Sequence, residues 1–409
     1  MYDLIVIGSG AAGIIAAIRA KQNNKNVLLL EQQSKIAPKL KATGGGRCNL
    51  TNTLSNDEFI SHFGKNGRFM TKALDEFDYK KLTSFMNSIG ISTHAPDGFR
   101  IFPTSHSSQT IIDGLNSYMQ KIGVDIKCNE KVVQILSQNN KIQALKTVNN
   151  TYTTKNILIA TGGKGYENLG ASGDGFDFAR TLGHKVTSLY PAMMPLFTKQ
   201  TWQGNCTANT IPKAQIQVDI KKHKKLKATG DLIFTKKGLR GPVVLDFARE
   251  ITPLFDKYDN IDIKINMVKG KNEDDILRFL KEQSLKNPTS TVLEHLEKIL
   301  AKSVILELSK LVSIDCNVTY KNLKGTKKAD FIKILCNTPF TITGHDGFRL
   351  AMITRGGISL KEVDQNTMQS KLISGLYFAG EVLDIDGPCG GYNLQWAFSS
   401  GYLAGNSIK

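Results

Sequence analysis

The stretch from Met1 to Glu31 constrains the fold more than any other part of the chain. Tyr2 to Ile7 is a short apolar run typical of a buried parallel strand, and Val27 to Leu30 is a second one. Between them, Gly8-Ser9-Gly10-Ala11-Ala12-Gly13 leads into an expected helix over Ile14 to Lys21. A strand, a tight glycine turn, a helix, a second strand and a closing acid form the pattern that binds the pyrophosphate of a dinucleotide.

Each glycine of this fingerprint has a physical task. Gly8 permits the tight turn, Gly10 lets the backbone approach a pyrophosphate, and Gly13 lets the helix pack closely on the strand. The N-terminus of the helix offers free N–H groups and a favourable dipole to the phosphates. Glu31 stands where it can accept hydrogen bonds from the adenosine ribose. We therefore expect a dinucleotide site rather than a merely glycine-rich turn.

Two later segments repeat the combination of a buried strand and a glycine-rich turn. One strand runs into Ala160-Thr161-Gly162-Gly163, and another, Leu376 to Ala379, ends at Gly380-Glu381. The loop after Glu381 is rich in glycine, and Tyr392-Asn393 opens a second helix. A strand, a carboxylate and a glycine-rich entry into a helix therefore occur near both ends of the chain. Two such sites suit FAD, an extended ligand with ADP at one end and a flavin at the other. The second helix dipole would stabilise negative charge on a reduced flavin.

The net charge and the cysteine pattern indicate which kinds of partner and which cellular compartment to expect. The net charge of +17 would suit an anionic partner, but the lysines are spread over the chain and Lys221 to Lys227 is the one dense cluster. Because that cluster has no interleaved aromatic residues, we expect a solvated hairpin tip, and a small-molecule substrate rather than a nucleic acid. The six cysteines form no CxxC pair, so neither a zinc ribbon nor a thioredoxin-like pair is expected. Because we find no secretion signal, we expect reduced thiols in the cytoplasm. No apolar run is long enough for a membrane span, and no metal site is expected.

Changes in the apolar period predict the domain organisation. From Pro191 to about Met267 the residues alternate, which favours an antiparallel β domain, and from Asn272 the period becomes helical. One helix is expected before Pro288, a second over Thr291 to Leu311 and a third over Lys327 to Leu335. We therefore predict a discontinuous cofactor-binding domain (1–190 and 345–409), an inserted β domain (191–267 and 336–344) and a helical subdomain (268–335).

Within the cofactor-binding part, further elements are expected. Asp97-Gly98 predicts a hairpin, and a helix over Gln109 to Ile122 ends at Gly123. Four successive strands should then form a meander: 124–127, 131–136, 141–148 and 156–159. Gly44-Gly45-Gly46 reads equally well as bare backbone against a flat ligand or as a flexible loop.

Six segments together carry a family resemblance. They are IGSGAAG (7–13), KATGGGRCNLTN (41–52), FPTSHSSQTI (102–111), ATGGKGYENLGASGDGF (160–176), GDLIFTKKGLRGPVVLDFAR (230–249), and the long run from ITRGG to YLAG (353–405). With these segments, the chain resembles the YhiN-like (BaiN/RdsA-type) family of NAD(P)/FAD-dependent oxidoreductase flavoproteins. The resemblance implies an α/β fold: a glutathione-reductase-type, Rossmann-like FAD-binding domain with an inserted antiparallel β-barrel and a small helical subdomain.

The resemblance also implies a set of FAD-contacting residues but no catalytic residue. The implied contacts are Gly8, Gly10, Ala11, Ala12, Gly13, Glu31, Gln32, Gly45, Gly46, Arg47, Cys48, Val132, Thr161, Gly162, Gly380, Glu381, Asp386, Gly391, Tyr392, Asn393 and Leu394. Cys48 and Cys389 are both expected near the flavin, as packing residues rather than as reactive thiols, because neither has an adjacent base.

The expected activity is hydride transfer between FAD and a small organic substrate. The family name offers NAD(P)H as the electron donor, yet residues 160–340 contain no second GxGxxG. NAD(P)H would then bind transiently at the flavin face. An amine-type oxidase, a flavin-containing RNA-modifying protein and a non-enzymatic redox sensor stay open as alternatives, and the oligomeric state is unknown.

Overall fold

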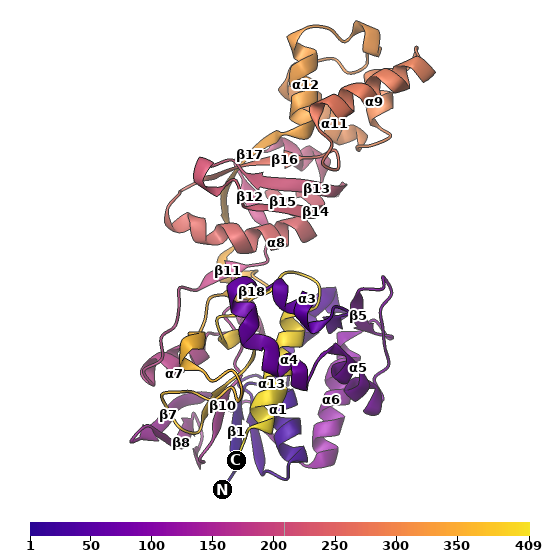
Figure 1. Ribbon diagram of the computed structural model, residues 1–409. Helices are drawn as coiled ribbons and strands as arrows, with labels where there is room; N and C mark the ends of the chain where they lie inside the picture. Colours follow the sequence, from indigo (N-terminus) through magenta and orange to yellow (C-terminus); the bar gives the residue numbers. More distant parts are fainter. Residues whose placement is uncertain (208) are drawn as a thin grey trace. The chain divides into compact units, whose positions relative to one another are not determined.

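The computed structural model describes residues 1–207 and 209–409, which form two compact units (Figure 1). The first unit comprises Met1–Pro191 and Met352–Lys409, and the second comprises Ala192–Ala351. The chain therefore leaves the first unit once and returns to it for its C-terminal segment.

A parallel sheet forms the centre of the first unit. Its strand order is β19-β10-β1-β2-β6, and neighbouring strands pair in parallel register. The strands are β1 (Leu4–Ile7), β2 (Val27–Leu30), β6 (Asp125–Lys127), β10 (Ile157–Ile159) and β19 (Leu376–Phe378). Every residue of β1, β2, β10 and β19 is buried, as expected for central parallel strands. The predicted α/β class is confirmed.

Two helices from opposite ends of the chain pack beside each other on this sheet. They are α1 (Ala11–Gln22) and α13 (Tyr392–Asn406), and α6 (Ser108–Ile122) also packs on α1 (Figure 1). A Cβ atom at Gly401 would lie 2.2 Å from the Ala12 carbonyl oxygen, and one at Gly405 would lie 2.3 Å from that of Ala16. The two helix backbones therefore touch, and no side chain fits at either glycine.

The expected meander is divided between two sheets, which corrects the sequence prediction. β6 and β10 belong to the parallel sheet, whereas β7 (Val132–Gln138), β8 (Lys141–Thr147) and β9 (Thr151–Thr153) form an antiparallel sheet of their own. The burial explains the division: β10 is buried throughout, while β8 alternates between buried and exposed residues.

The remaining elements of the first unit are short. The predicted hairpin at Asp97-Gly98 joins β4 (Thr93–His94) to β5 (Arg100–Pro103), and Gly123 ends α6 with a φ of 78°. The others are α2 (Pro38–Ala42), β3 (Thr51–Asn52), α3 (Asn56–Ser61), α4 (Thr71–Glu76), α5 (Tyr79–Ser88), α7 (Asp174–Thr181), β18 (Ile353–Arg355), which pairs with β11 (Tyr190–Ala192), and the 3-10 turns η1 (Thr43–Gly46), η2 (Gly64–Met70), η3 (Glu167–Leu169), η9 (Leu360–Glu362) and η10 (Gly380–Val382).

A closed antiparallel barrel forms one part of the second unit, in the order β12-β15-β14-β13-β16-β17. Its strands are β12 (Leu196–Thr198), β13 (Thr210–Val218), β14 (Lys227–Thr235), β15 (Gly238–Arg240), β16 (Ile261–Asn266) and β17 (Thr338–His345). The predicted inserted barrel is thus confirmed. Helix α8 (Pro242–Ile251), which the alternation analysis did not predict, buries Val243, Val244 and Phe247 in the barrel core.

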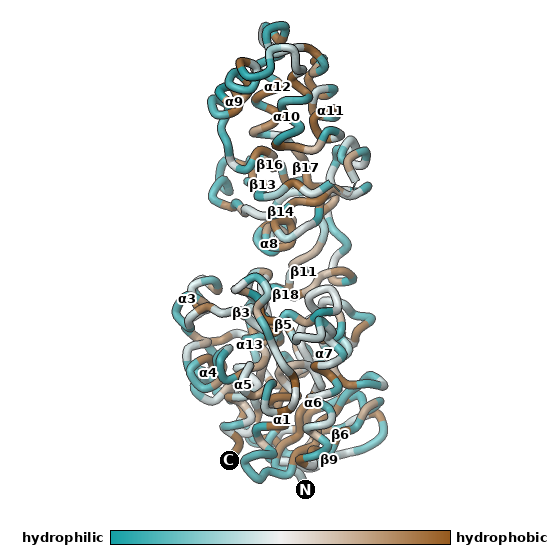
Figure 2. The backbone as a smooth tube through the Cα atoms, turned by 90° about the vertical axis from the view of Figure 1, so that its right-hand side faces the viewer, coloured by the Kyte–Doolittle hydropathy of each residue, from teal (hydrophilic) through white to brown (hydrophobic). Residues whose placement is uncertain are grey.

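Four helices lie between β16 and β17, and they differ from the prediction at one place. They are α9 (Glu273–Lys286), α10 (Val292–Leu296), α11 (Lys302–Leu311) and α12 (Thr326–Cys336). The single helix expected over Thr291 to Leu311 is broken after Leu296, because α11 begins afresh from an extended Ala301. The barrel and these helices share one buried apolar cluster, and Figure 2 shows hydrophobic residues around α11 and β16 as well as around α1. The division into a β domain and a helical subdomain stays a prediction.

Candidate functional site

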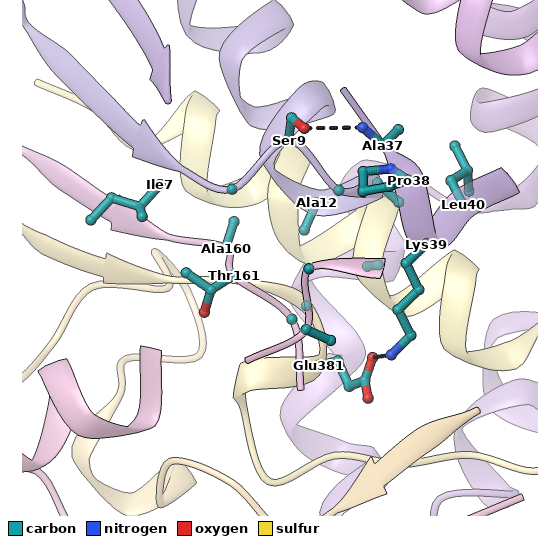
Figure 3. Close-up of a pocket in the computed structure, with 18 of the residues that line it drawn as sticks. Ile7, Ser9, Ala12, Ala37, Pro38, Lys39, Leu40, Ala160, Thr161 and Glu381 are labelled. Carbon is teal, nitrogen blue, oxygen red and sulfur yellow. Dashed lines mark hydrogen bonds and ion pairs between the residues drawn. The ribbon is translucent and has the colours of Figure 1, made fainter. Parts of the chain in front are cut away.

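A cavity of about 1290 Å³ lies in the first unit (Figure 3). Its walls come from the end of β1, the start of α1, the end of β2, α2, the starts of β7 and α7, the end of β10, β18, the turn after β19 and the start of α13. The carboxyl ends of β1, β2, β10 and β19 all face it, which is where open parallel sheets bind ligands.

The N-terminus of α1 opens into this cavity. Gly10 is the N-cap, and no side chain caps the helix. A Cβ atom at Gly10 would meet nothing within 4 Å, whereas one at Gly13 would lie 1.9 Å from the Gly8 carbonyl oxygen. Gly10 therefore leaves room for a ligand, and Gly13 allows α1 to approach β1. The uncapped N–H groups of the first turn are the donors that a pyrophosphate needs.

Glu31 is buried at the end of β2 and is held by protein donors. Its Oε2 accepts hydrogen bonds from the Ser9 backbone N–H (3.1 Å) and the Ser9 hydroxyl (2.5 Å), and its Oε1 accepts one from the Gln33 N–H (2.9 Å). The Ser9 hydroxyl in turn accepts the Ala37 N–H at 3.0 Å (Figure 3). One acceptor position of Oε1 is left, and this fits a ribose hydroxyl.

Both lysines that line the cavity are paired with carboxylates. Lys39 Nζ lies 2.8 Å from Glu381 Oε2 (Figure 3), and Lys131 Nζ lies 3.2 Å from Asp174 Oδ2. The other oxygen of Glu381 accepts the Thr354 N–H at 2.8 Å. The Lys39–Glu381 pair joins α2 to the turn after β19, so it ties two walls of the cavity together.

The cavity wall holds two further polar side chains, Glu130 and Thr161. Hydrogen bonds from Asn149, Asn150 and Thr147 lower the pKa of Glu130 to about 2, so this cavity-lining carboxylate is ionised near neutral pH. The Thr161 hydroxyl is buried and has no hydrogen-bond partner among the described residues. Leaving a buried hydroxyl without a partner costs free energy, and a ligand that supplies a donor or an acceptor there would remove that cost.

A loop from the C-terminal segment borders the start of α13 and is tightly held. Asn393 accepts a hydrogen bond from the Gly387 N–H (2.8 Å) and donates one to the Gly387 carbonyl (2.9 Å). Asn52 donates to the Gly390 carbonyl at 2.9 Å, and a Cβ atom at Gly391 would lie 2.5 Å from the Thr51 carbonyl group. The segment around Thr51 and this loop, far apart in sequence, are therefore packed backbone to backbone.

Most of the residues that the family resemblance implied lie together in the cavity wall. Those that line it are Gly8, Gly10, Ala11, Ala12, Glu31, Gln32, Val132, Thr161, Gly162, Gly380, Glu381, Asn393 and Leu394. Those outside the lining are Gly13, Gly45, Gly46, Arg47, Cys48, Asp386, Gly391 and Tyr392. Gly45 and Gly46 present bare, exposed backbone, and the Arg47 guanidinium lies 5.4 Å from the centre of the Phe102 ring. Contacts of all these residues with FAD stay predictions.

Cys48 is fully buried, and burial raises the pKa of its thiol to about 12. Thiolate is the reactive form of cysteine, so Cys48 is suited to packing rather than to nucleophilic or redox chemistry. Cys389 is half-buried, and all six cysteines are free thiols. No group of three or more metal-ligating side chains occurs within residues 1–207 and 209–409.

The sequence interpretation missed several residues of the wall. Ser9, Lys39 and Glu130 line the cavity with charged or hydroxyl groups, and Ile353 and Trp396 line it with apolar surface. Only Ser9 had a local signal, a hydroxyl between two fingerprint glycines. The others reach the cavity because strands and helices distant in sequence meet there.

This site belongs to a chain whose relatives can be identified. The model of the "HI0933-like protein Rossmann domain" matches residues 2–407. The chain belongs to the HI0933-like family. A 3-dehydro-bile acid delta(4,6)-reductase of Clostridium scindens is 30% identical over 409 residues, which cover 100% of this chain and 99% of that protein. A ribosomal RNA dihydrouridine synthase of Haemophilus influenzae is 29% identical, covering 99% of this chain and 98% of that protein.

A solved structure supports the fold. The 3-ketosteroid delta1-dehydrogenase of Sterolibacterium denitrificans superimposes with a TM-score of 0.55 at 12% identity, covering 100% of this chain and 99% of that one. This member of the HI0933-like family is an FAD-dependent oxidoreductase. No helix among the described residues is both long and apolar enough to cross a lipid bilayer.

Proposed function

We propose that the chain reduces a carbon–carbon double bond that is conjugated with a carbonyl group. The support is that two relatives of nearly equal identity carry names with this chemistry in common. A 3-dehydro steroid with a delta(4) bond has its double bond next to the 3-ketone, and uracil has its 5,6 double bond next to a ring carbonyl. In both substrates the carbonyl makes the far carbon an acceptor for hydride.

FAD fits the residues of the cavity, which we propose as its site. Glu31 would accept a ribose hydroxyl, the first turn of α1 would hold the pyrophosphate, and the start of α13 would face the flavin. Bound FAD supplies hydride transfer, a chemistry that no side chain of the cavity provides. The protein holds and orients both reactants, and the paired charges of Lys39 and Glu381 keep the cavity walls together.

NAD(P)H is the electron donor that we propose. The overall reaction balances when NAD(P)H and one proton convert the unsaturated substrate to the saturated one and release NAD(P)+. The absence of a second dinucleotide fingerprint supports a donor that binds in the cleft used by the substrate. Donor and substrate would exclude each other, so turnover should be ping-pong. The cytoplasm, where NAD(P)H and reduced thiols are both present, is the proposed compartment.

Anaerobic stopped-flow spectroscopy tests the donor and the substrate in turn. The FAD-loaded protein is mixed with NADH, NADPH or a panel of primary amines, and flavin bleaching is followed. Bleaching by a nicotinamide, followed by reoxidation with a 4-en-3-one steroid or with uridine in RNA, is the expected result. Bleaching by amines alone, with peroxide release in air, would instead identify an amine-type oxidase.

A further inference from the structure

The outer face of the barrel carries ordered rows of polar side chains. From Ala214 onward strand β13 alternates, with Ala214, Ile216 and Val218 buried and the residues between them exposed. Cross-strand pairing places Gln217 between Lys227 of β14 and Lys264 of β16. The same pairing places Gln215 between Thr229 and Asn266, so two parallel rows of hydrogen-bonding side chains cross three strands.

These rows line a hollow of about 890 Å³ that has no acidic residue in its wall. Its lining is Gln215, Ile216, Gln217, Lys227, Ala228, Thr229, Lys264, Asn266, Cys336 and Asn337. Lys264 is paired with Asp219 at 2.8 Å, and the Gln217 amide donates to the Lys224 carbonyl at 2.6 Å. The side chains of Gln215, Lys227 and Thr229 have no partner within residues 1–207 and 209–409, so their donors are available.

The hollow continues into the lysine-rich tip between β13 and β14. This tip is the turn η5 (Lys221–His223) and the residues after it, and Lys221, Lys222, Lys224, Lys225 and Lys227 are all exposed. None of these five lysines forms an ion pair with any described residue. We call the hollow and the tip together the basic face.

We propose that the basic face binds an RNA strand that carries the uracil to be reduced. This inference rests on the proposed function, since uracil is a conjugated substrate of the required class. Lysine ammonium groups with amide and hydroxyl donors form the usual set that contacts nucleic-acid phosphates and sugars. This proposal reverses our expectation from the sequence that a tip without interleaved aromatic residues does not bind nucleic acid, because contacts to phosphates and sugars need no base stacking.

The composition of the face argues for RNA over a membrane surface. Stable attachment to a bilayer requires apolar side chains or lipid in addition to positive charge. The exposed large apolar residues are Met1, Val133, Val148, Leu285, Leu311, Met352 and Leu372, and none belongs to the basic face. Among the described residues, the face therefore carries no exposed large apolar side chain that could enter a bilayer.

The test removes the charge of the tip and leaves the cofactor cavity intact. In one full-length variant, Lys221, Lys222, Lys224, Lys225 and Lys227 are all changed to Gln. A matched control changes five other exposed lysines of the second unit that form no ion pair, Lys281, Lys286, Lys321, Lys324 and Lys333, to Gln. Binding of a fluorescent uridine-rich RNA oligonucleotide is measured by anisotropy from 50 to 200 mM salt.

The tip variant should bind the RNA at least tenfold more weakly than the natural chain. Its slope of log affinity against log salt should fall by about 3, since each phosphate contact to a single strand contributes about 0.7. The control should bind as the natural chain does. The tip variant should also lose dihydrouridine formation in RNA, yet keep flavin bleaching by NAD(P)H and reduction of a small enone.

The remaining outcomes overturn the inference in distinguishable ways. Equal RNA affinity in the natural chain and the tip variant would remove the basic face as an RNA site. Lysine-dependent binding to phosphatidylglycerol vesicles without RNA binding would make the face a membrane surface. If the flavin is bleached but neither uridine nor an enone is reduced, the proposed function fails, whatever the RNA affinity.

Discussion

In the cofactor cavity of the first unit, both lining lysines have carboxylate partners, whereas the five lysines at the tip of the basic face have none among the described residues. The wall of the cavity is formed by many chain segments. Its buried Glu31 is held by hydrogen bonds from Ser9 and Gln33. The basic face needs only three neighbouring strands and one turn. A preorganised and enclosed site suits one defined ligand, while an open array of free cations suits a repeating polyanion whose binding depends on salt.

The two tryptophans allow this comparison to be tested one unit at a time. Trp396 lines the cavity, and Trp202 packs against Phe234 and Phe340 in the second unit. The chain has only these two tryptophans. In a Trp202→Phe background the emission of Trp396 therefore reports on the first unit, and in a Trp396→Phe background the emission of Trp202 reports on the second.

The largest effect is expected from Gly13→Ala. Its Cβ atom would collide with the Gly8 carbonyl oxygen, so α1 must move away from β1. We expect loss of FAD binding and a fall of about 3 kcal/mol in the free energy of unfolding of the first unit. Denaturation followed by Trp396 emission measures it, with Trp202 emission unchanged. Gly10→Ala, whose Cβ atom meets open space, should keep the fold and lose only FAD affinity.

Glu31→Ala should come next. FAD binding should weaken by about 1.5–3 kcal/mol, the size of a hydrogen bond to a charged group. Titration of the apo-protein with FAD gives the affinity, and RNA affinity should not change. Ser9→Ala serves as the control, because it removes a donor to Glu31 and leaves the carboxylate in place. An unchanged FAD affinity in Glu31→Ala would rule out the ribose contact.

Lys39→Met should have a smaller effect. Both members of the Lys39–Glu381 pair are partly exposed, at 25% and 21%, so the pair is screened by solvent. We expect FAD affinity to fall by no more than about 1 kcal/mol, far less than the change in RNA affinity caused by the tip variant. Lys131→Met, at the other paired lysine, is the matched comparison. A steep salt dependence of FAD binding would show that the two regions differ less than their geometry indicates.

The smallest effect concerns the thiols. Because Cys48 is fully buried and burial raises the pKa of its thiol to about 12, it is almost entirely protonated at pH 8, and a thiol reagent should leave it unlabelled in the folded protein. The half-buried Cys128 and Cys389 should be labelled first. Peptide mass spectrometry after brief labelling checks the order, and unfolding in urea should make all six equal. Rapid labelling of folded Cys48 would contradict its packing role.

The sequence predicted local structure well, but it did not predict which residues from distant segments come together in the folded chain. Gly8, Gly10 and Glu31 were predictable because one continuous stretch of chain contains the turn, the helix start and the acid. Lys39 and Ile353 were not predictable as lining residues, because they reach the cavity only through the tertiary placement of α2 and β18. Proximity along the chain does not decide which residues line the cavity: Thr43 lines it, whereas Arg47 lies outside the lining and over the Phe102 ring.

The second unit shows the same limit. Alternation in β13 and β16 predicted the barrel, since a one-sided sheet must alternate. Helix α8 was hidden within that β-rich stretch, where Val243, Val244 and Phe247 gain burial only inside the barrel. The basic face follows from strand register, which places Lys227 and Lys264 on either side of Gln217, and no single-strand pattern reveals that.

The pairing of β10 with β19 has a consequence for how the protein is made. β10 ends at Ile159 and β19 begins at Leu376, so the 216 residues from 160 to 375 must be synthesised between them. At about 5–20 residues per second, one edge of the central sheet lacks its neighbour for about 10–40 s. Helix α13, which packs through Gly401 and Gly405 onto α1, is made later still. A nascent chain must therefore protect an open sheet edge and the bare face of α1 while the whole second unit emerges.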